Sequence, residues 1–359
     1  MHVQKLEKES HTDCPKRNCA KNVHRNNYWY YKVKLEERRY KHDYYTGALN
    51  RISNFNEGEI YMSTIKKENA FKVFIVSLFF PVLYWLLLQV IPFIYGIIYG
   101  ISYGISHGGG GSVDKDVLTQ KLSDALTSNW LYITLAAVVV FFLIVFIVFK
   151  VRHQNFMKRI WFNPMPKQTF LFVAILAIGV CFADNLFNFI LPQSWLTQYT
   201  STASSEFEAK GLILAIIITG LIVPITEETA FRGLMVTQLY GRMSAWLVVV
   251  ISALAFALYH ALGSVSQAIS IVPVGVILCL VFLWTKSILA TILIHMINNI
   301  INVLIMGIPA LSTFNANSVS TLNLIVSIVG LAITVIMMVI IYKRRVIEKA
   351  SDVNTNINW

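Results

Sequence analysis

Long apolar runs alternate with short polar segments from about residue 71 to residue 345. A helix needs about 20 apolar residues to cross a bilayer. The runs that approach or exceed this length are 71–106, 130–149, 170–191, 211–240, 244–260, 266–284, 287–306 and 322–342. The pattern predicts an all-α, polytopic membrane protein with about eight transmembrane helices, and we expect Pro81 and Pro92 to kink the first of them.

The same pattern divides the chain into three regions. Residues 1–70 are polar and aromatic without a clear period, which predicts a basic cytosolic N-terminal segment that is partly ordered or disordered. Residues 71–345 form the predicted membrane domain, and residues 346–359 form a predicted cytosolic tail.

Composition and charge agree with this division. Hydrophobic residues make up 56% of the chain and charged residues 14%, against about 25% charged residues in an average soluble domain. The net charge is +11, and half of the Lys and Arg residues lie within residues 1–72. Because basic segments that flank apolar runs are held on the cytosolic side, we expect a multi-pass protein of the cell membrane with both termini cytosolic. We interpret the basic N-terminus in this way rather than as a nucleic-acid-binding surface.

Few ionisable side chains interrupt the later apolar runs, and a charged side chain at the centre of a bilayer costs roughly 2.5 to 3.5 kcal/mol to insert. These residues are Asp184, Glu227, Glu228, Arg232, His260 and His295. Glu228 and Arg232 are four residues apart, so they share a helix face and can neutralise each other. Glu227 points about 100° away from that face and has no such partner in its own helix. Glu227 is therefore a candidate for proton transfer.

Two further runs carry imidazole groups. Phe256 and His260 share one helix face, and His295 and Asn299 share another. Each group alone is explained more simply by packing or by interhelical hydrogen bonds. Together, a carboxylate, two imidazoles and an amide offer a base for water and donors for an oxyanion, as peptide hydrolysis requires. We interpret Tyr259 as an aromatic packing residue.

In chain order, these residues form Glu-Glu-x-x-x-Arg, Phe-x-x-x-His and His-x-x-x-Asn. Over about residues 170–306 this trio resembles the CPBP family, the CAAX proteases and bacteriocin-processing enzymes that are also labelled abortive-infection proteins. The resemblance implies an all-helical, glutamic-type intramembrane endopeptidase. Its substrate would be a small membrane-associated or lipidated peptide, with bacteriocin processing or immunity as one possible role.

The resemblance also implies a role for each matched residue. Glu227 and His260 would activate the water, and His295 and Asn299 would stabilise the oxyanion. The supporting residues would be Glu228, Arg232 and Phe256. At 1.5 Å per residue, however, the carboxylate and the two imidazoles would differ in depth by up to roughly two helical turns, a gap that helix tilt, kinks or misplaced helix boundaries could close.

Alternatives stay open for both the chemistry and the function. Zn²⁺ could be held by Glu227, His260 and His295 with water as fourth ligand, although we favour a metal-free site without a cofactor. A non-enzymatic immunity or scaffold protein of the same fold, or a proton-coupled transporter, could use the same buried groups. The complete set of motif residues argues against the scaffold, and the lack of an evident internal repeat argues against the transporter. We expect membrane lipid and a peptide substrate as partners, and no nucleic acid.

Overall fold

The computed structural model describes residues 70–107, 114–191, 211–261, 265–314 and 320–352. The chain divides into one unit of Met1–Lys67 and a second unit of Glu68–Trp359, and all described residues belong to the second. The predicted order or disorder of residues 1–69 therefore lies outside the described residues.

The described elements are helices of the α, 3-10 and π types joined by turns, which confirms the prediction of an all-α, polytopic membrane protein. Among the described residues, seven helical segments are long and apolar enough to cross a membrane. These are Phe71–His107, Lys115–Val151, Lys167–Phe187, Leu212–Leu239, Gln267–Thr285, Ile288–Gly307 and Thr321–Arg345. The run predicted at 244–260 is also a helix, α11 (Ala245–His260), but its 16 residues fall short of the length that a perpendicular span needs.

The first predicted span consists of two helices, α2 (Ala70–Ser77) and α3 (Phe79–His107). Their junction at Leu78 lies just before Pro81, which lacks the backbone N–H that would continue the hydrogen-bond ladder. The helix continues through Pro92, which lies inside α3. Of the two kinks predicted for this span, the structure shows an interruption of the helix near Pro81.

The second span, α4 (Lys115–Val151), is much longer than the predicted run of 130–149. Asp114 explains its early start, because the Asp114 carboxylate accepts a hydrogen bond from the backbone N–H of Asp116 at 2.9 Å. Such an N-cap satisfies a donor that the first helical turn leaves without a partner. Most of the segment between the predicted runs 71–106 and 130–149 is therefore helical.

The rest of the chain forms the elements around the candidate site. They are α5 (Phe156–Arg159), α6 (Lys167–Asp184), η2 (Asn185–Phe189), α8 (Leu212–Ala215), η3 (Ile216–Ile222), α9 (Val223–Glu228), η4 (Thr229–Val236), α10 (Thr237–Leu239), α12 (Val265–Thr285), α13 (Ile288–Gly307), η5 (Pro309–Phe314) and α14 (Thr321–Asp352). Two of these, η3 and η4, are π-helical. The last helix continues to Asp352, so the predicted tail 346–359 begins within it.

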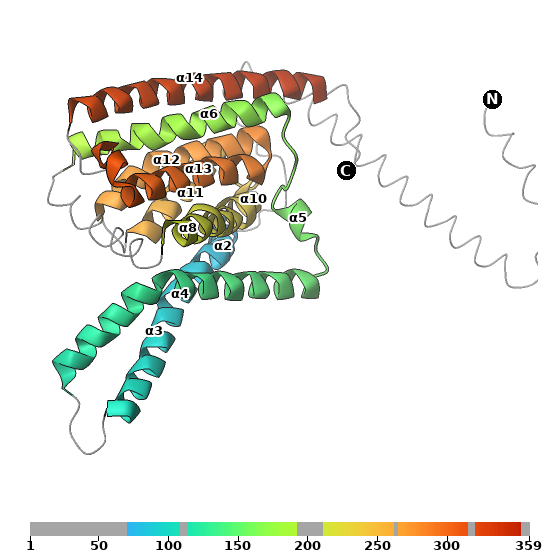
Figure 1. Cartoon of the computed structure of the whole chain (residues 1–359). Coiled ribbons are helices and arrows are strands. Elements are labelled where there is room, and N and C mark those ends of the chain that lie inside the picture. The colour runs from blue at the N-terminus through green and yellow to red at the C-terminus, as the bar shows by residue number, and fades with distance from the viewer. Residues whose placement is uncertain (1–69, 108–113, 192–210, 262–264, 315–319, 353–359) are drawn as a thin grey trace, which may run out of the picture. The chain divides into compact units, whose positions relative to one another are not determined.

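The α6 and α14 helices lie side by side (Figure 1). A Cβ atom built on Gly330 would lie 2.8 Å from the backbone nitrogen of Ala183 and 2.9 Å from the Gly179 carbonyl oxygen. A Cβ atom built on Gly179 would lie 3.0 Å from the Gly330 carbonyl oxygen. The two glycines therefore allow the backbones to approach closely, as small residues do between membrane helices.

The basic segment 150–168, which links the predicted runs 130–149 and 170–191, folds against the turn between α12 and α13. The backbone N–H of Ile288 donates to the Trp161 carbonyl oxygen at 3.0 Å, and Asn163 Nδ2 donates to the Lys286 carbonyl oxygen at 2.6 Å. The Lys286 ammonium lies 4.6 Å from the centroid of the Trp161 ring. These contacts tie the segment that follows α4 to the start of α13.

The main hydrophobic core draws buried side chains from α4, α6, η4, α11, α12 and α13. Large apolar side chains such as Phe93 and Ile105 on α3 remain exposed, as expected of helices that face lipid. The candidate site lies within this core, where η4, α11 and α13 meet.

Candidate active site

Glu227 and Glu228 are the last two residues of α9, between the π-helical segments η3 and η4. Single π-helical turns are rare and often occur at functional sites. The Glu228 side chain is fully buried, and the Glu227 side chain is 5% exposed. A pair of buried carboxyl groups in this position needs partners, which η4, α11 and α13 supply.

Arg232 is the first of these partners. Arg232 Nη1 donates to Glu228 Oε1 at 2.9 Å, and both side chains are fully buried. Arg232 Nη2 donates to the Gly275 carbonyl oxygen at 3.4 Å, and the guanidinium lies 4.3 Å from the centroid of the Phe256 ring. The ion pair that the four-residue spacing predicts is therefore present and is enclosed by α12 and α11.

His295 connects the two glutamates. His295 Nδ1 lies 2.9 Å from Glu228 Oε1, and His295 Nε2 lies 3.7 Å from Glu227 Oε2. Because the Glu228 carboxylate is paired with an arginine and acts as an acceptor, the hydrogen of this bond belongs to Nδ1. The Nε2 atom of His295 is thereby directed to Glu227.

His260 approaches the same oxygen from α11. Its Nδ1 atom donates to the Phe256 carbonyl oxygen at 2.8 Å, since a carbonyl oxygen only accepts. Its Nε2 atom lies 3.9 Å from Glu227 Oε2. Both imidazole Nε2 atoms thus face one carboxylate oxygen at separations too long for a direct hydrogen bond.

These contacts resolve the depth difference that the sequence predicts. Glu227, His260 and His295 meet, although their positions along separate helices suggest different depths.

Phe256 packs at the centre of the group. Its ring centroid lies 4.7 Å from that of His260 and 5.7 Å from that of His295, in both cases edge to face. The residue is only 2% exposed. Phe256 therefore separates the Glu228–Arg232 pair from bulk water and limits the rotation of both imidazole rings.

Tyr259 makes a polar contact with Glu227 that the sequence interpretation missed. Its hydroxyl donates to Glu227 Oε1 at 3.0 Å, so it does more than pack. The ring stacks on Tyr84 of α3 with centroids 5.8 Å apart, and Tyr84 is fully buried. Glu227 Oε2, in contrast, has no hydrogen-bond partner among the described residues. The only sequence signal for Tyr259 was its position directly before His260, and Tyr84 lies far from the motifs.

Asn299 lies one helical turn after His295, and its described contact leads to a different neighbour. Asn299 Nδ2 donates to the Thr219 carbonyl oxygen of η3 at 3.0 Å. The structure thus joins six of the seven predicted site residues through direct contacts with one another, and holds Asn299 against the π-helical segment that precedes them.

Glu227, His260 and His295 carry side-chain atoms of the types that bind metal ions. Within the described ranges, no group of three or more His, Cys, Asp or Glu side chains has the spacing of metal ligands. Ligand atoms at about 2.0–2.1 Å from a tetrahedral Zn²⁺ lie about 3.3–3.4 Å from one another. The separations of 3.7 and 3.9 Å from Glu227 Oε2 to the two Nε2 atoms are wider than that. The ligand types suit zinc, and both separations fall between the value for zinc ligands and the roughly 4.6 Å between two groups that share one tetrahedral water at about 2.8 Å.

Residues 209–301 match the family model for Rce1-like proteins, described as type II CAAX prenyl endopeptidase Rce1-like. Neither curated proteins nor solved structures give a significant match to the chain. The matched segment contains every predicted site residue. These are Glu227, Glu228, Arg232, Phe256, His260, His295 and Asn299.

Proposed function

Because residues 209–301 match the family model for type II CAAX prenyl endopeptidase Rce1-like proteins, we propose that this chain is an intramembrane protease of the CPBP and CAAX type with the following reaction. The protein hydrolyses a peptide bond in a small membrane-associated or lipidated peptide, using a water molecule activated by Glu227 and His260. One observation carries this proposal: buried Glu227 Oε2 faces the Nε2 atoms of two histidines at 3.7 and 3.9 Å.

The hydrogen bonds of His260 support its role beside the water. Because Nδ1 donates to the Phe256 carbonyl oxygen, Nε2 of the neutral ring is an acceptor. A water molecule could therefore donate one hydrogen to His260 Nε2 and the other to Glu227 Oε2. As the water oxygen attacks the carbonyl carbon, Glu227 takes the proton, and it returns that proton to the amide nitrogen when the C–N bond breaks.

His295 and Asn299 would stabilise the oxyanion of the tetrahedral intermediate. Since His295 Nδ1 is already a donor to Glu228, donation from its Nε2 requires the protonated ring. The Asn299 amide has two N–H groups, and the bond to Thr219 uses one of them. Donors that are held in place before the reaction are the most effective means of stabilising such an oxyanion.

Comparative peptidomics tests this function and identifies the substrate. Membranes and medium are compared between cells that carry the wild type, Glu227→Gln or the control Asp184→Asn, another replacement of a buried acid by its amide. Prenylated peptide tails and bacteriocin leaders are the first classes to search for. A peptide product that is absent only with Glu227→Gln supports the proposal, and full biological function with Glu227→Gln would favour a non-enzymatic scaffold instead.

A further inference from the structure

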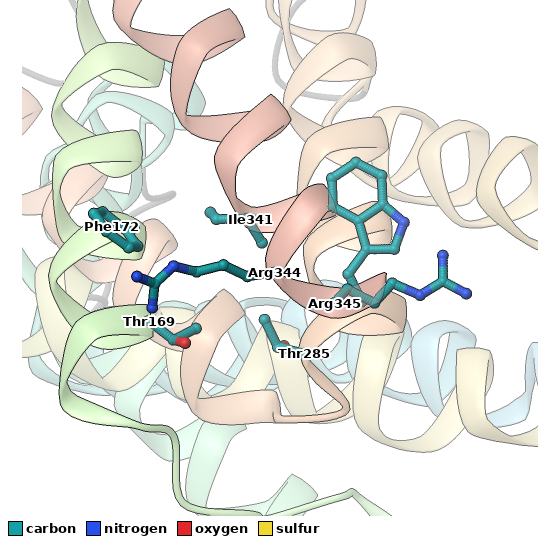
Figure 2. A pocket seen from close by; sticks show the side chains of 7 residues that line it. Thr169, Phe172, Thr285, Ile341, Arg344 and Arg345 are labelled. Atoms are coloured by element: carbon teal, nitrogen blue, oxygen red, sulfur yellow. The ribbon is translucent and has the colours of Figure 1, made fainter. Parts of the chain in front are cut away.

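A shallow pocket lies where the start of α6 meets the ends of α12 and α14 (Figure 2). The lining residues are Thr169, Phe172, Trp284, Thr285, Ile341, Arg344 and Arg345. None of the candidate active-site residues is among them, so this pocket is a separate feature of the membrane domain.

Two arginines give the pocket its charge. Arg344 Nη1 donates to Gln168 Oε1 at 2.6 Å, and the guanidinium lies 4.6 Å from the centroid of the Phe172 ring. These contacts hold the guanidinium in place, while its five N–H donors exceed what Gln168 can accept. Arg345 lines the same pocket, and the described lining includes no acidic side chain. The pocket is therefore suited to an anion.

Thr169 adds a neutral donor to this charge. Its side-chain oxygen is buried and has no hydrogen-bond partner among the described residues, and the residue is 7% exposed. Thr169 lies in the first turn of α6, where Pro166 provides no side-chain cap and no acidic residue is present. The first N–H groups of a helix lack partners within that helix and attract anions, phosphate in particular. A hydroxyl, an uncapped helix start and the Arg344 guanidinium together form the donor set of a phosphate site, while the Arg345 side chain runs in the opposite direction from Arg344 and adds positive charge at the pocket (Figure 2).

The position of the pocket along the membrane domain indicates where that phosphate comes from. The last candidate span ends at Arg345, which lines the pocket. The rings of Trp284 and Tyr342 lie 5.2 Å apart at the same end of the bundle. Trp and Tyr are enriched at the headgroup level of a bilayer, and basic pockets between transmembrane helices bind anionic headgroups. We propose that Thr169 and Arg344 bind the phosphate group of an anionic phospholipid, with Arg345 adding positive charge beside it.

Native mass spectrometry of the purified full-length protein tests this proposal. Phosphatidylglycerol and phosphatidylcholine are titrated separately into the wild type, Arg344→Gln/Arg345→Gln and Thr169→Val. Lys343→Gln serves as the matched control, because it removes one positive charge from the same helix at an exposed position outside the pocket. We expect the wild type to retain phosphatidylglycerol preferentially, with a loss of about fivefold in affinity for each arginine removed. Thr169→Val should give a smaller loss, and Lys343→Gln should bind like the wild type.

The control and a competition arm make the test decisive. An equal loss with Lys343→Gln would show only general surface charge and would overturn the proposal, as would equal retention of the two lipids by the wild type. Inorganic phosphate is added alone in a parallel titration. If it binds as tightly as phosphatidylglycerol and with the same dependence on the variants, the lipid assignment is overturned in favour of a dissolved anion.

Discussion

The hydroxyl of Tyr259 donates a hydrogen bond to one oxygen of Glu227 at 3.0 Å, while the other oxygen of that carboxylate faces His260 and His295. Tyr259 therefore fixes the carboxylate through Oε1, while Oε2 faces the two imidazole rings. If Glu227 activates the water as proposed, this arrangement makes Tyr259 a positioning residue, which would act through Glu227.

Tyr259→Phe should lower kcat by about ten- to a hundredfold, because hydrogen bonds to charged groups contribute about 1.5–3 kcal/mol. KM should change little, since phenylalanine keeps the ring that stacks on Tyr84. Steady-state kinetics of the purified variant with the identified substrate separates the two constants. Tyr99→Phe on α3 is the control and should leave kcat unchanged. An unchanged kcat for Tyr259→Phe would remove Tyr259 from the mechanism.

The Glu228–Arg232 pair should be essential for stability. Arg232→Gln removes the guanidinium that pairs with the buried Glu228 carboxylate, and breaking a buried ion pair typically costs about 3–5 kcal/mol. Thermal unfolding in detergent should show a large loss for Arg232→Gln. The double variant Glu228→Gln/Arg232→Gln should lose less than the sum of the two single variants, because it leaves no uncompensated charge. Additive losses would argue against direct coupling of the pair.

The contact of α6 with α14 predicts that Gly330 tolerates no side chain. The added methyl group of Gly330→Ala would meet backbone atoms of α6 at 2.8–2.9 Å, and such overpacking typically costs about 1–3 kcal/mol. Gly104→Ala is the matched control, because nothing lies within 4 Å of a Cβ atom at that position. We expect a lower unfolding temperature for Gly330→Ala and an unchanged or raised one for Gly104→Ala. Equal unfolding temperatures would contradict the close approach of the two helices.

Metal removal provides a separate test of the chemistry. If Glu227 and His260 activate the water without a metal ion, the purified protease should keep its activity after prolonged treatment with a strong chelator. Elemental analysis of the same sample measures bound zinc. A stoichiometric zinc ion whose removal abolishes activity, and whose return restores it, would replace the metal-free account with a zinc site.

Much of this architecture can be predicted from local sequence patterns. Apolar run lengths locate the spans, and the four-residue spacing predicts that Glu228 meets Arg232, because both properties depend on a single helix. Phe256 and His260 share a face for the same reason, and the structure joins them through both a ring contact and a backbone hydrogen bond.

Features that depend on two distant elements could not be predicted in this way. The bond from Tyr259 to Glu227 links α11 to α9, and that from Asn299 to Thr219 depends on a π-helical segment that periodicity does not reveal. The meeting of the carboxylate with both imidazoles depends on how the helices sit in the bundle. A calculation from residue counts alone therefore gives the wrong depths.

The central claim is that Glu227 activates water for peptide hydrolysis within the membrane domain. The most direct measurement follows cleavage of the identified substrate in H₂¹⁸O by purified wild type and Glu227→Gln, using mass spectrometry of the product. The account predicts that the new C-terminal carboxylate carries the label and that Glu227→Gln lowers the rate by about 10²–10⁴-fold. Undiminished cleavage by Glu227→Gln, or a product without the label, would contradict it.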